Sequence, residues 1–289
     1  MKSDSFCGQV AIVTGASAGI GRAAALQLAA QGAKVVIAAR RTDRLEEVAR
    51  SGRELGAEML VVMTDVSDEA QCQMLIEKAV TEFGRLDLLI TNAGMAVSAL
   101  LEDLPDLTLF RQNVAVNFYG AVYCTYYALP YLKAAQGRIV SVSSLGGKTA
   151  IPYNSPYCAS KYALHGFFDS LRMELNQYKI SVTMVCPWWV ATEFHAAQLT
   201  KEGKPRGAQR GKDFYTRRTM SAEKCAAIIL RAAYRRKREV LLGPGVLAVW
   251  LKTLAPGLLD WLAIKVFLEP AIRRAKAAQL KEMNNINKE

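Results

Sequence analysis

The 289-residue chain lacks the sequence features of several protein classes. Its six cysteines include no Cys-x-x-Cys pair, which argues against a zinc site and against a redox pair. It has no Asn-x-Ser/Thr sequon, and no charged and then apolar leader precedes residue 9. We therefore expect a protein of a reducing compartment, most simply the cytoplasm, without a metal site.

Basic charge is concentrated in one stretch of the chain. Of the net charge of +11, most comes from residues 201–240, which hold 13 Lys+Arg against 4 Asp+Glu. Such a stretch suits phosphate contact, but no nucleic-acid recognition motif accompanies it, and a solvated surface explains it equally well. We expect no nucleic-acid partner. A hydrophobic content of 51% suits one large α/β domain, with or without an appendage.

A glycine-rich turn stands between a strand and a helix near the N-terminus. An apolar run over 9–13 leads into Thr14-Gly15-Ala16-Ser17-Ala18-Gly19-Ile20-Gly21, and a helical pattern over 22–31 and a second apolar run over 34–39 follow. In such a βαβ unit the glycines let the backbone approach a pyrophosphate, which the helix N-terminus stabilises. The turn residues expected to bind the cofactor are Gly15, Ser17, Gly19, Ile20 and Gly21.

The end of the second strand indicates which dinucleotide binds. NAD sites commonly place an acid there for the ribose 2′-hydroxyl, but here the residues are Arg40 and Arg41. A guanidinium binds a 2′-phosphate through forked, charge-assisted hydrogen bonds. We predict NADP(H), with Arg40 as the first choice and Arg41 as the second. The alternative is that both arginines merely cap an exposed loop.

Helical and strand patterns alternate through the rest of the chain. This alternation predicts an α/β fold with a Rossmann-type, doubly wound parallel sheet, whose ligands bind beyond the carboxyl ends of the strands. Residues at or just after such ends are Asp65 and Val66 (beside the adenine), Asn92-Ala93-Gly94, Ser144 and Pro187. Ser67 is the expected cap of a helix over 68–83.

Asn117 lies in the middle of a long, mostly apolar segment over 106–135. An asparagine inside a helix can simply face solvent. Its neighbours Val114, Val116 and Phe118 favour a buried amide instead, and a buried amide needs hydrogen-bond partners.

Tyr157 and Lys161 lie four residues apart, and so on one face of a helix, one turn apart. Ser155 is the expected N-cap and Pro156 the first helical residue. A free phenol titrates near ~10, and an adjacent ammonium group lowers that pKa toward the working pH of a general acid–base. Alone the motif is weak, because an ordinary tyrosine beside a solvated lysine has the same spacing.

Together, in order and spacing, these motifs resemble the short-chain dehydrogenases/reductases over roughly residues 8–243. The resemblance implies that Tyr157 exchanges the proton of the substrate oxygen, and that Lys161 binds the nicotinamide ribose and lowers the tyrosine pKa. It implies that Ser144, with Ser143 as a stand-in, holds the carbonyl oxygen. Asn117 would support a water that leads protons to Lys161. It also implies cofactor contacts at Pro187, Val190 and Thr192.

One position departs from the family's pattern. Members usually have Pro-Gly after the sixth strand, whereas this chain has Pro187-Trp188-Trp189. We expect both tryptophans to line an apolar substrate pocket with Ser144 and Leu145; the alternative is that one or both belong to the core. The irregular, basic residues 193–220 predict a substrate lid. His195 within it needs no catalytic role beside a tyrosine.

The chain continues beyond the catalytic domain, expected over 1–243, into an appendage over 244–289. Its apolar runs over 246–255 and 258–268 flank Pro256-Gly257 and are shorter than the about 20 residues that span a bilayer. The appendage either covers the pocket or an interface, or lies in a membrane surface beside the basic run 235–238. We slightly favour the membrane surface. A basic helix is expected over 271–283.

The leading functional hypothesis is an NADPH-dependent reductase of an apolar, lipid- or steroid-like ketone or aldehyde. The alternative is a protein that binds NADP(H) on the same fold as a sensor, without turnover. The presence of all four catalytic residues that the resemblance implies (Tyr157, Lys161, Ser144 and Asn117, the tetrad) argues against it. The resemblance further implies a dimer or tetramer built through the helices of Asn117 and Tyr157. The long appendage favours the dimer.

Overall fold

A computed structural model describes residues 5–207 and 219–270 of the chain, and its centre is one sheet of parallel strands. The sheet order is β3-β2-β1-β4-β5-β6-β9. Its strands are β1 (Val10–Thr14), β2 (Lys34–Ala39), β3 (Met59–Met63), β4 (Leu88–Thr91), β5 (Arg138–Val142), β6 (Ser181–Cys186) and β9 (Glu239–Leu241). The inner strands are buried on both faces, which is why they are continuous apolar runs rather than alternating ones.

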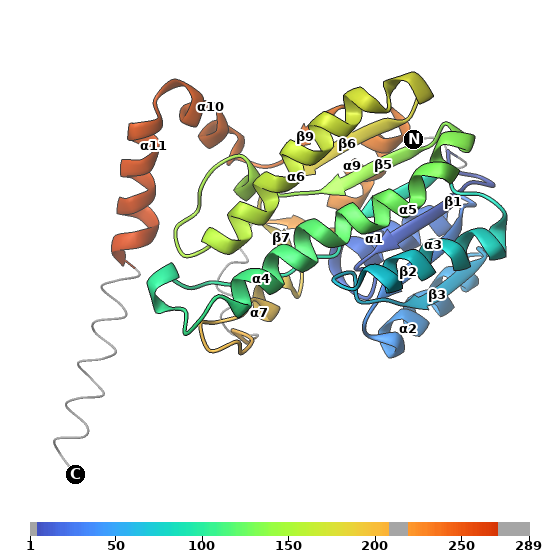
Figure 1. Cartoon of the computed structure of the whole chain (residues 1–289), viewed down its shortest axis with the longest axis horizontal. Helices are drawn as coiled ribbons and strands as arrows, with labels where there is room; N and C mark the ends of the chain where they lie inside the picture. The colour runs from blue at the N-terminus through green and yellow to red at the C-terminus, as the bar shows by residue number, and fades with distance from the viewer. Residues whose placement is uncertain (1–4, 208–218, 271–289) are drawn as a thin grey trace, which may run out of the picture.

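Helices cover both faces of the sheet (Figure 1). One face carries α1 (Gly19–Ala29), α2 (Thr42–Glu54) and α9 (Ala222–Tyr234), and the other carries α3 (Glu69–Phe83), α5 (Gly120–Ala135) and α6 (Ser155–Glu174). After β3 the chain returns to the middle of the sheet, so that β4 pairs with β1. This order confirms the predicted doubly wound sheet and opens a crevice at the carboxyl ends of β1 and β4.

The segment over 106–135 is helical in three parts. In it, α4 (Thr108–Val114) is joined to α5 by a turn of π-helix, Ala115–Tyr119, which contains Asn117. Ser67 does not cap α3. Asp68 does, because its carboxylate accepts from the backbone N–H of Gln71 at 3.2 Å, while Ser67 bonds to Asp65.

The N-terminus of α6 also shifts by one residue. Ser155, the expected N-cap, is the first helical residue, and Asn154 takes the cap position without a side-chain cap. Pro156 still lies in the first turn, where a missing N–H costs nothing. Tyr157 and Lys161 therefore keep their positions on one face of the helix.

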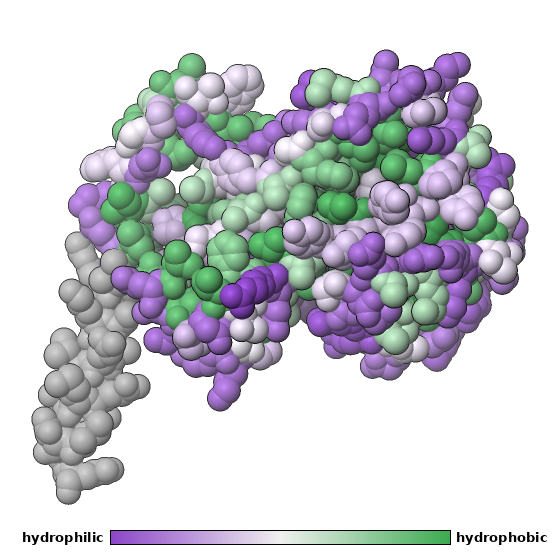
Figure 2. Space-filling view, in the orientation of Figure 1, coloured by the Kyte–Doolittle hydropathy of each residue, from purple (hydrophilic) through white to green (hydrophobic). Residues whose placement is uncertain are grey.

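Beyond β9 the described part of the appendage forms α10 (Val246–Leu254), α11 (Pro256–Ala263) and a π-helical turn, Ile264–Leu268. It stands apart at one end of the molecule (Figure 1), and Figure 2 shows hydrophobic residues on its surface. The two apolar runs form separate helices that divide just before Pro256, which is the first residue of α11. Within the described residues, no helix is long and apolar enough to cross a membrane. The basic helix expected over 271–283 lies outside the described residues.

A small second sheet and a short helix follow β6. The elements are β7 (Val190–Ala191), α7 (Phe194–Ala197) and β8 (Met220–Ser221), with β7 parallel to β8. The small sheet flanks the segment expected to form a lid over 193–220, and α7 lies within it; residues 208–218 of this segment are outside the described part.

Candidate active site

The glycine-rich loop after β1 packs directly against the loop after β4. Gly15 has a φ of +66°, and a Cβ atom there would lie 2.8 Å from the Cα of Ala93. A Cβ atom on Gly21 would lie 2.5 Å from Nδ2 of Asn92. Both positions therefore need glycine, and the tight loop leads straight into the N-terminus of α1, where an anion is stabilised.

Asn92 holds this loop in place. Its Nδ2 donates to the carbonyl oxygens of Thr14 at 3.0 Å and Gly15 at 3.3 Å. The backbone N–H groups of Asn92 and Ala93 both donate to Oγ1 of Thr14. We predicted Asn92 as a cofactor contact; its side chain is also a brace for the loop that would carry the pyrophosphate.

The two arginines after β2 differ in what they reach. Nη2 of Arg41 donates to Oγ of Ser17 in the glycine-rich loop at 3.2 Å. Arg40 is more exposed, and its only ion pair among the described residues is a long one, 3.8 Å, to Asp65. The structure thus places Arg41, the second choice from sequence, closer to the loop residues than Arg40.

Asp65 and Val66 lie at the end of β3 with different surroundings. Asp65 accepts from the backbone N–H of Ser67 at 3.0 Å and from its hydroxyl at 2.7 Å. Val66 is buried, and a Cβ atom on Gly120 would lie 2.8 Å from it. Asp65 therefore keeps a partly exposed carboxylate beside the crevice, whereas Val66 forms part of the wall.

Lys161 is buried on α6 and turned toward the end of β5. Its Nζ donates to the carbonyl oxygen of Val142 at 3.0 Å and lies 5.8 Å from the centre of the Tyr157 ring. Burial lowers the pKa of Lys161 to about 8. The ammonium group thus sits beneath the tyrosine, with a backbone carbonyl as its partner.

Tyr157 does not have the lowered pKa that the Tyr-x-x-x-Lys spacing led us to expect. In the protein alone, desolvation raises the pKa of Tyr157 to about 12, and a hydrogen bond with Ser144 only partly opposes this rise. The physical reason is that packing around the half-buried tyrosine desolvates its hydroxyl, while Nζ of Lys161 lies 5.8 Å from the ring centre and donates to the carbonyl oxygen of Val142.

Ser143 and Ser144, consecutive in the chain, point to different sites. Ser144 hydrogen-bonds with Tyr157 and accepts from the N–H of Gly146 at 3.0 Å. Ser143 is buried and turned toward His165 Nε2, 3.2 Å away. The structure therefore separates the two serines that the sequence left as alternatives: Ser144 is the one beside the tyrosine.

Asn117 is buried at the centre of an amide and hydroxyl network. Its Oδ1 accepts from the N–H of Met95 at 2.8 Å. Its Nδ2 lies 2.9 Å from three acceptors, which are the carbonyl oxygen of Met95, Oδ1 of Asn113 and Oγ of Ser160. The buried, partnered amide predicted from its neighbours is confirmed. Asn113 and Ser160 were missed, although one lies four residues before Asn117 and the other directly before Lys161.

Trp188, the departure from the family pattern, is accommodated by glycines at the start of the appendage. It stacks on Trp189 with ring centres 5.4 Å apart. A Cβ atom on Gly243 would lie 2.6 Å from Cβ of Trp188, and one on Gly245 would lie 2.5 Å from Cζ3 of its ring and 2.8 Å from Leu145. Both tryptophans are half-buried, so they form neither full core nor free surface.

The residues after Pro187 lie close to both the glycine-rich loop and Tyr157. A Cβ atom on Gly19 would lie 3.0 Å from Cγ2 of Thr192, which places Thr192 beside the glycine-rich loop. The ring of Phe194, in α7, is centred 6.0 Å from that of Tyr157. Val190 is buried, and Ile20 packs on the same core, so both contribute packing to the crevice wall.

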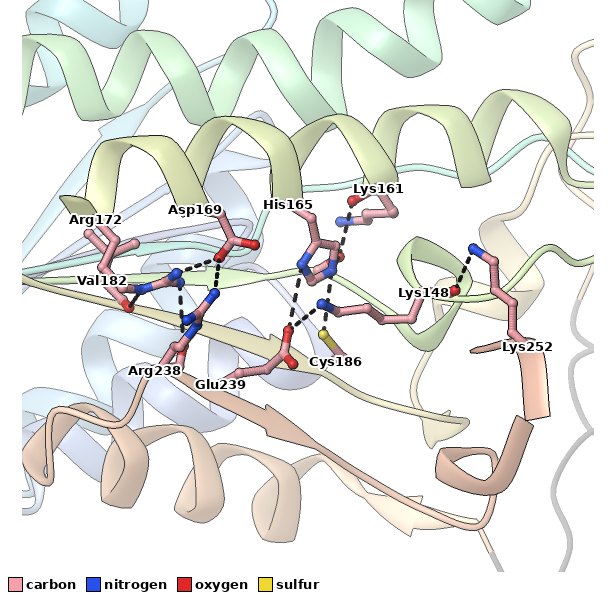
Figure 3. A network of polar contacts seen from close by, with 11 residues as sticks. Lys148, Lys161, His165, Asp169, Arg172, Val182, Cys186, Arg238, Glu239 and Lys252 are labelled. Atoms are coloured by element: carbon pink, nitrogen blue, oxygen red, sulfur yellow. Dashed lines mark hydrogen bonds and ion pairs between the residues drawn. The ribbon is translucent and has the colours of Figure 1, made fainter. Parts of the chain in front are cut away.

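A second buried polar cluster, absent from the sequence predictions, lies behind the tetrad (Figure 3). His165, one turn beyond Lys161, has Nδ1 3.6 Å from Glu239 of β9 and Nε2 3.6 Å from Sγ of Cys186. Lys148 pairs with the same carboxylate at 2.7 Å. Burial, helped by the Lys148 charge, lowers the pKa of His165 to about 4. Nε2 is within hydrogen-bonding reach of Ser143 and Cys186, whereas Nδ1 faces Glu239 without a hydrogen bond among the described residues, so the imidazole is buried between β6 and β9 with one nitrogen unsatisfied.

The family model described as short chain dehydrogenase matches residues 9–203. The chain belongs to the short-chain dehydrogenases/reductases. It is therefore an oxidoreductase of this family. It is 36% identical over 271 residues to 11-beta-hydroxysteroid dehydrogenase A of Sesamum indicum, covering 92% of this chain and 77% of that protein. It is 34% identical to the Dictyostelium discoideum dehydrogenase/reductase SDR family protein 7-like, covering 90% and 82%.

Solved structures of other dehydrogenases share the fold. A Burkholderia phymatum member in complex with NAD has a TM-score of 0.79 at 28% identity, covering 88% of this chain and 96% of that one. An alcohol dehydrogenase from Thermococcus sibiricus, complexed with 5-hydroxy-NADP, has a TM-score of 0.70 at 26% identity, covering 81% and 96%. These relatives bind nicotinamide cofactors of both kinds.

Proposed function

We propose that the protein is an NADPH-dependent reductase of an apolar ketone or aldehyde, acting reversibly. The observation that carries the proposal is the hydrogen-bonded pair of Ser144 and Tyr157 above the buried ammonium of Lys161, at the carboxyl edge of the sheet. A bound nicotinamide supplies or accepts the hydride. Ser144 and Tyr157 hold the carbonyl oxygen, and Tyr157 delivers the proton as the oxygen gains negative charge.

The raised pKa of Tyr157 suits the reductive direction. A phenol that stays protonated near neutral pH is ready to donate, and Lys161 stabilises the phenolate that donation leaves. Asn117, fixed by Met95 and Ser160, would position the polar groups behind Lys161 that return the proton.

A preference for NADP(H) is supported by charge at the end of β2. Arg40 and Arg41 stand where an NAD site commonly has an acid, and Arg41 already contacts Ser17 of the glycine-rich loop. A 2′-phosphate there gains forked hydrogen bonds.

An apolar substrate is supported by the stacked Trp188 and Trp189 beside Leu145, and by the relatives named as hydroxysteroid dehydrogenases. We further propose that the appendage lies on a membrane surface. Trp250 and Trp261 expose 63% and 55% of their surface there, and the basic run 235–238 precedes it in the chain. Pelleting with anionic vesicles, lost when both tryptophans become serine, tests this placement.

We also propose a homodimer through α5 and α6. Tyr126 and Tyr119 of this surface expose 65% and 47% of their area, and these exposed rings offer apolar surface that a second subunit would cover. Sedimentation of the wild type against Tyr126→Glu tests it.

The decisive experiment compares Tyr157→Phe with the wild type against a panel of steroid and lipid ketones. We expect turnover to fall by about 10²–10⁴-fold while NADPH binding, read from its fluorescence, is kept. Tyr162→Phe, on the same helix, is the matched control and should turn over normally. Unchanged turnover in Tyr157→Phe would defeat the mechanism. A wild type that binds NADPH tightly and reduces nothing on the panel would favour the sensing alternative.

A further inference from the structure

Three charged side chains from two distant parts of the chain meet beside the glycine-rich loop. Glu193, just before α7, accepts from Nη1 of Arg44 at 2.6 Å through Oε1, and its Oε2 lies 3.5 Å from Nη1 of Arg41. Arg41 in turn donates to Ser17. Arg44 and Glu193 are 149 residues apart in sequence, and neither was among the predicted cofactor residues.

We propose that Arg44 is a further residue of the 2′-phosphate site and that Glu193 is a built-in anion which the phosphate displaces. This inference rests on the proposed preference for NADP(H). Glu193 then determines cofactor specificity by competition: it weakens the binding of a phosphorylated cofactor and leaves the unphosphorylated one untouched.

The chemistry of the three groups suits an exchange of anions. Arg41 and Arg44 present two guanidinium forks toward one carboxylate, whereas a phosphate offers three acceptor oxygens and more charge. The hydrogen bond from Arg44 holds the pKa of Glu193 below its usual range, so the carboxylate is charged at neutral pH. All three side chains are exposed to between 40% and 54%, so each ion pair is weak and can open toward solvent.

The same contact reaches toward the catalytic tyrosine. Phe194 follows Glu193 directly, and its ring is centred 6.0 Å from that of Tyr157. A phosphate that displaces Glu193 therefore releases the anchor at one end of α7, next to the reacting tyrosine. Phosphate recognition at the adenosine end and the position of α7 over the tyrosine are thereby linked through two consecutive residues.

The test measures cofactor binding alone and needs no substrate. NADPH and NADH are titrated by fluorescence into the wild type, Glu193→Gln, Arg44→Met and the double variant. We expect Glu193→Gln to bind NADPH about fivefold more tightly and NADH unchanged, since the glutamine removes the competing charge. Arg44→Met should bind NADPH about tenfold more weakly, again with NADH unchanged. In the Arg44→Met background, Glu193→Gln should gain less.

Glu58→Gln is the matched control, because Glu58 is an equally exposed glutamate that pairs with Lys34 at the opposite end of β2. It should change neither affinity. A wild type that binds NADPH and NADH equally would overturn both the cofactor preference and this inference. A wild type that prefers NADPH, with Glu193→Gln within twofold of it or weaker, would overturn the inference alone.

Discussion

Two helices with apolar faces, α6 and α10, differ in how far those faces are buried. On α6 the side chains of Leu164 and Phe168 are fully buried against the sheet. On α10, Leu247 and Leu254 expose 75% and 79% of their surface. The periodic pattern is similar in both helices, so a pattern predicts that a helix has an apolar face but not what covers that face. In α6 the cover is the run of buried strands; in the described part of the chain, nothing comparable covers Leu247 and Leu254 of α10.

The difference extends to polar contacts. Along α6 one face carries Tyr157, Lys161 and His165, each tied to a strand or loop of the domain. On α10 the tie is Lys252, whose Nζ donates to the carbonyl oxygen of Lys148 at 3.1 Å and contacts the hydroxyl of Tyr162. The domain fixes its catalytic helix from several sides, while the appendage is held mainly at its root.

The largest expected effect is a difference in the free energy of unfolding between alanine substitutions at two phenylalanines. Phe168→Ala removes a fully buried ring and should lower the free energy of unfolding by about 3–5 kcal/mol. Phe267→Ala, at a residue 41% exposed in the appendage, should change it by less than about 0.5 kcal/mol. Urea unfolding of both variants measures the contrast. A comparable loss at Phe267 would mean that the appendage is covered in solution.

The next effect concerns how the free energy of unfolding depends on pH through the buried His165. An unfolded histidine binds its proton near ~6.5, whereas the folded His165 has a pKa of about 4. As pH falls from 6.5 to 4 the unfolded state takes up more protons, so the free energy of unfolding falls, by up to about 3 kcal/mol. The charges facing His165 come from Lys148 and from Glu239 of β9, together with Lys161 and Asp169 on its own helix.

His165→Gln removes this titration. The variant should lose less stability than the wild type between pH 6.5 and 4.5, measured by urea unfolding at several pH values. Identical pH profiles for the two proteins would show that the buried imidazole does not contribute to the acid sensitivity.

A pair of glycines sharpens the comparison at the root of the appendage. Gly245→Ala would place a Cβ atom 2.4 Å from Cε3 of the Trp188 ring, and we expect the free energy of unfolding to fall by about 1–3 kcal/mol and the tryptophan emission to change. Gly257→Ala, in α11, meets nothing within 4 Å and should be neutral or stabilise by about 0.5–1 kcal/mol. Equal thermal shifts for the two variants would contradict the packing of Trp188 on this junction.

The smallest expected effect is at Lys252. Lys252→Met keeps the length of the side chain but removes its hydrogen bonds, and an exposed contact of this kind is worth less than about 1 kcal/mol. Unfolding of the domain should be unchanged, while chymotrypsin should cleave the appendage faster. A cleavage rate equal to that of the wild type would mean that the root is held by Trp188 alone.

The parts of the site that the sequence predicted are those written in local patterns. The glycine turn between strand and helix, the four-residue spacing of Tyr157 and Lys161, and the apolar neighbours of Asn117 each need only a few consecutive residues. The alternation of helical and strand patterns likewise predicted the doubly wound parallel sheet. Helix ends were off by one residue at Ser67 and Ser155: at Ser67 the neighbouring Asp68 takes the cap, and at Ser155 the helix begins one residue earlier than expected, without a side-chain cap.

What the sequence could not predict depends on contacts between distant residues. Glu193 reaches Arg44, His165 reaches Glu239, and Trp188 fits against Gly245 only once the sheet is assembled. The direction of the Tyr157 pKa was wrong for the same reason: spacing placed the lysine nearby, but the degree of enclosure around the ring comes from the whole fold.

The return of the chain from β3 to the middle of the sheet has a consequence for how sequence segments could be exchanged between relatives. It gathers the residues proposed to bind the adenosine and pyrophosphate into the first 94 positions, and those proposed to choose the substrate into the positions after 142. We therefore expect the two halves to recombine as blocks, with a new substrate specificity joined to an old cofactor. Thr192 and Glu193 are exceptions, because they belong to the second block by sequence, but Thr192 lies beside Gly19 and Glu193 bonds to arginines of the first block. A chimera that respects every other boundary would still have to carry compatible partners at these positions.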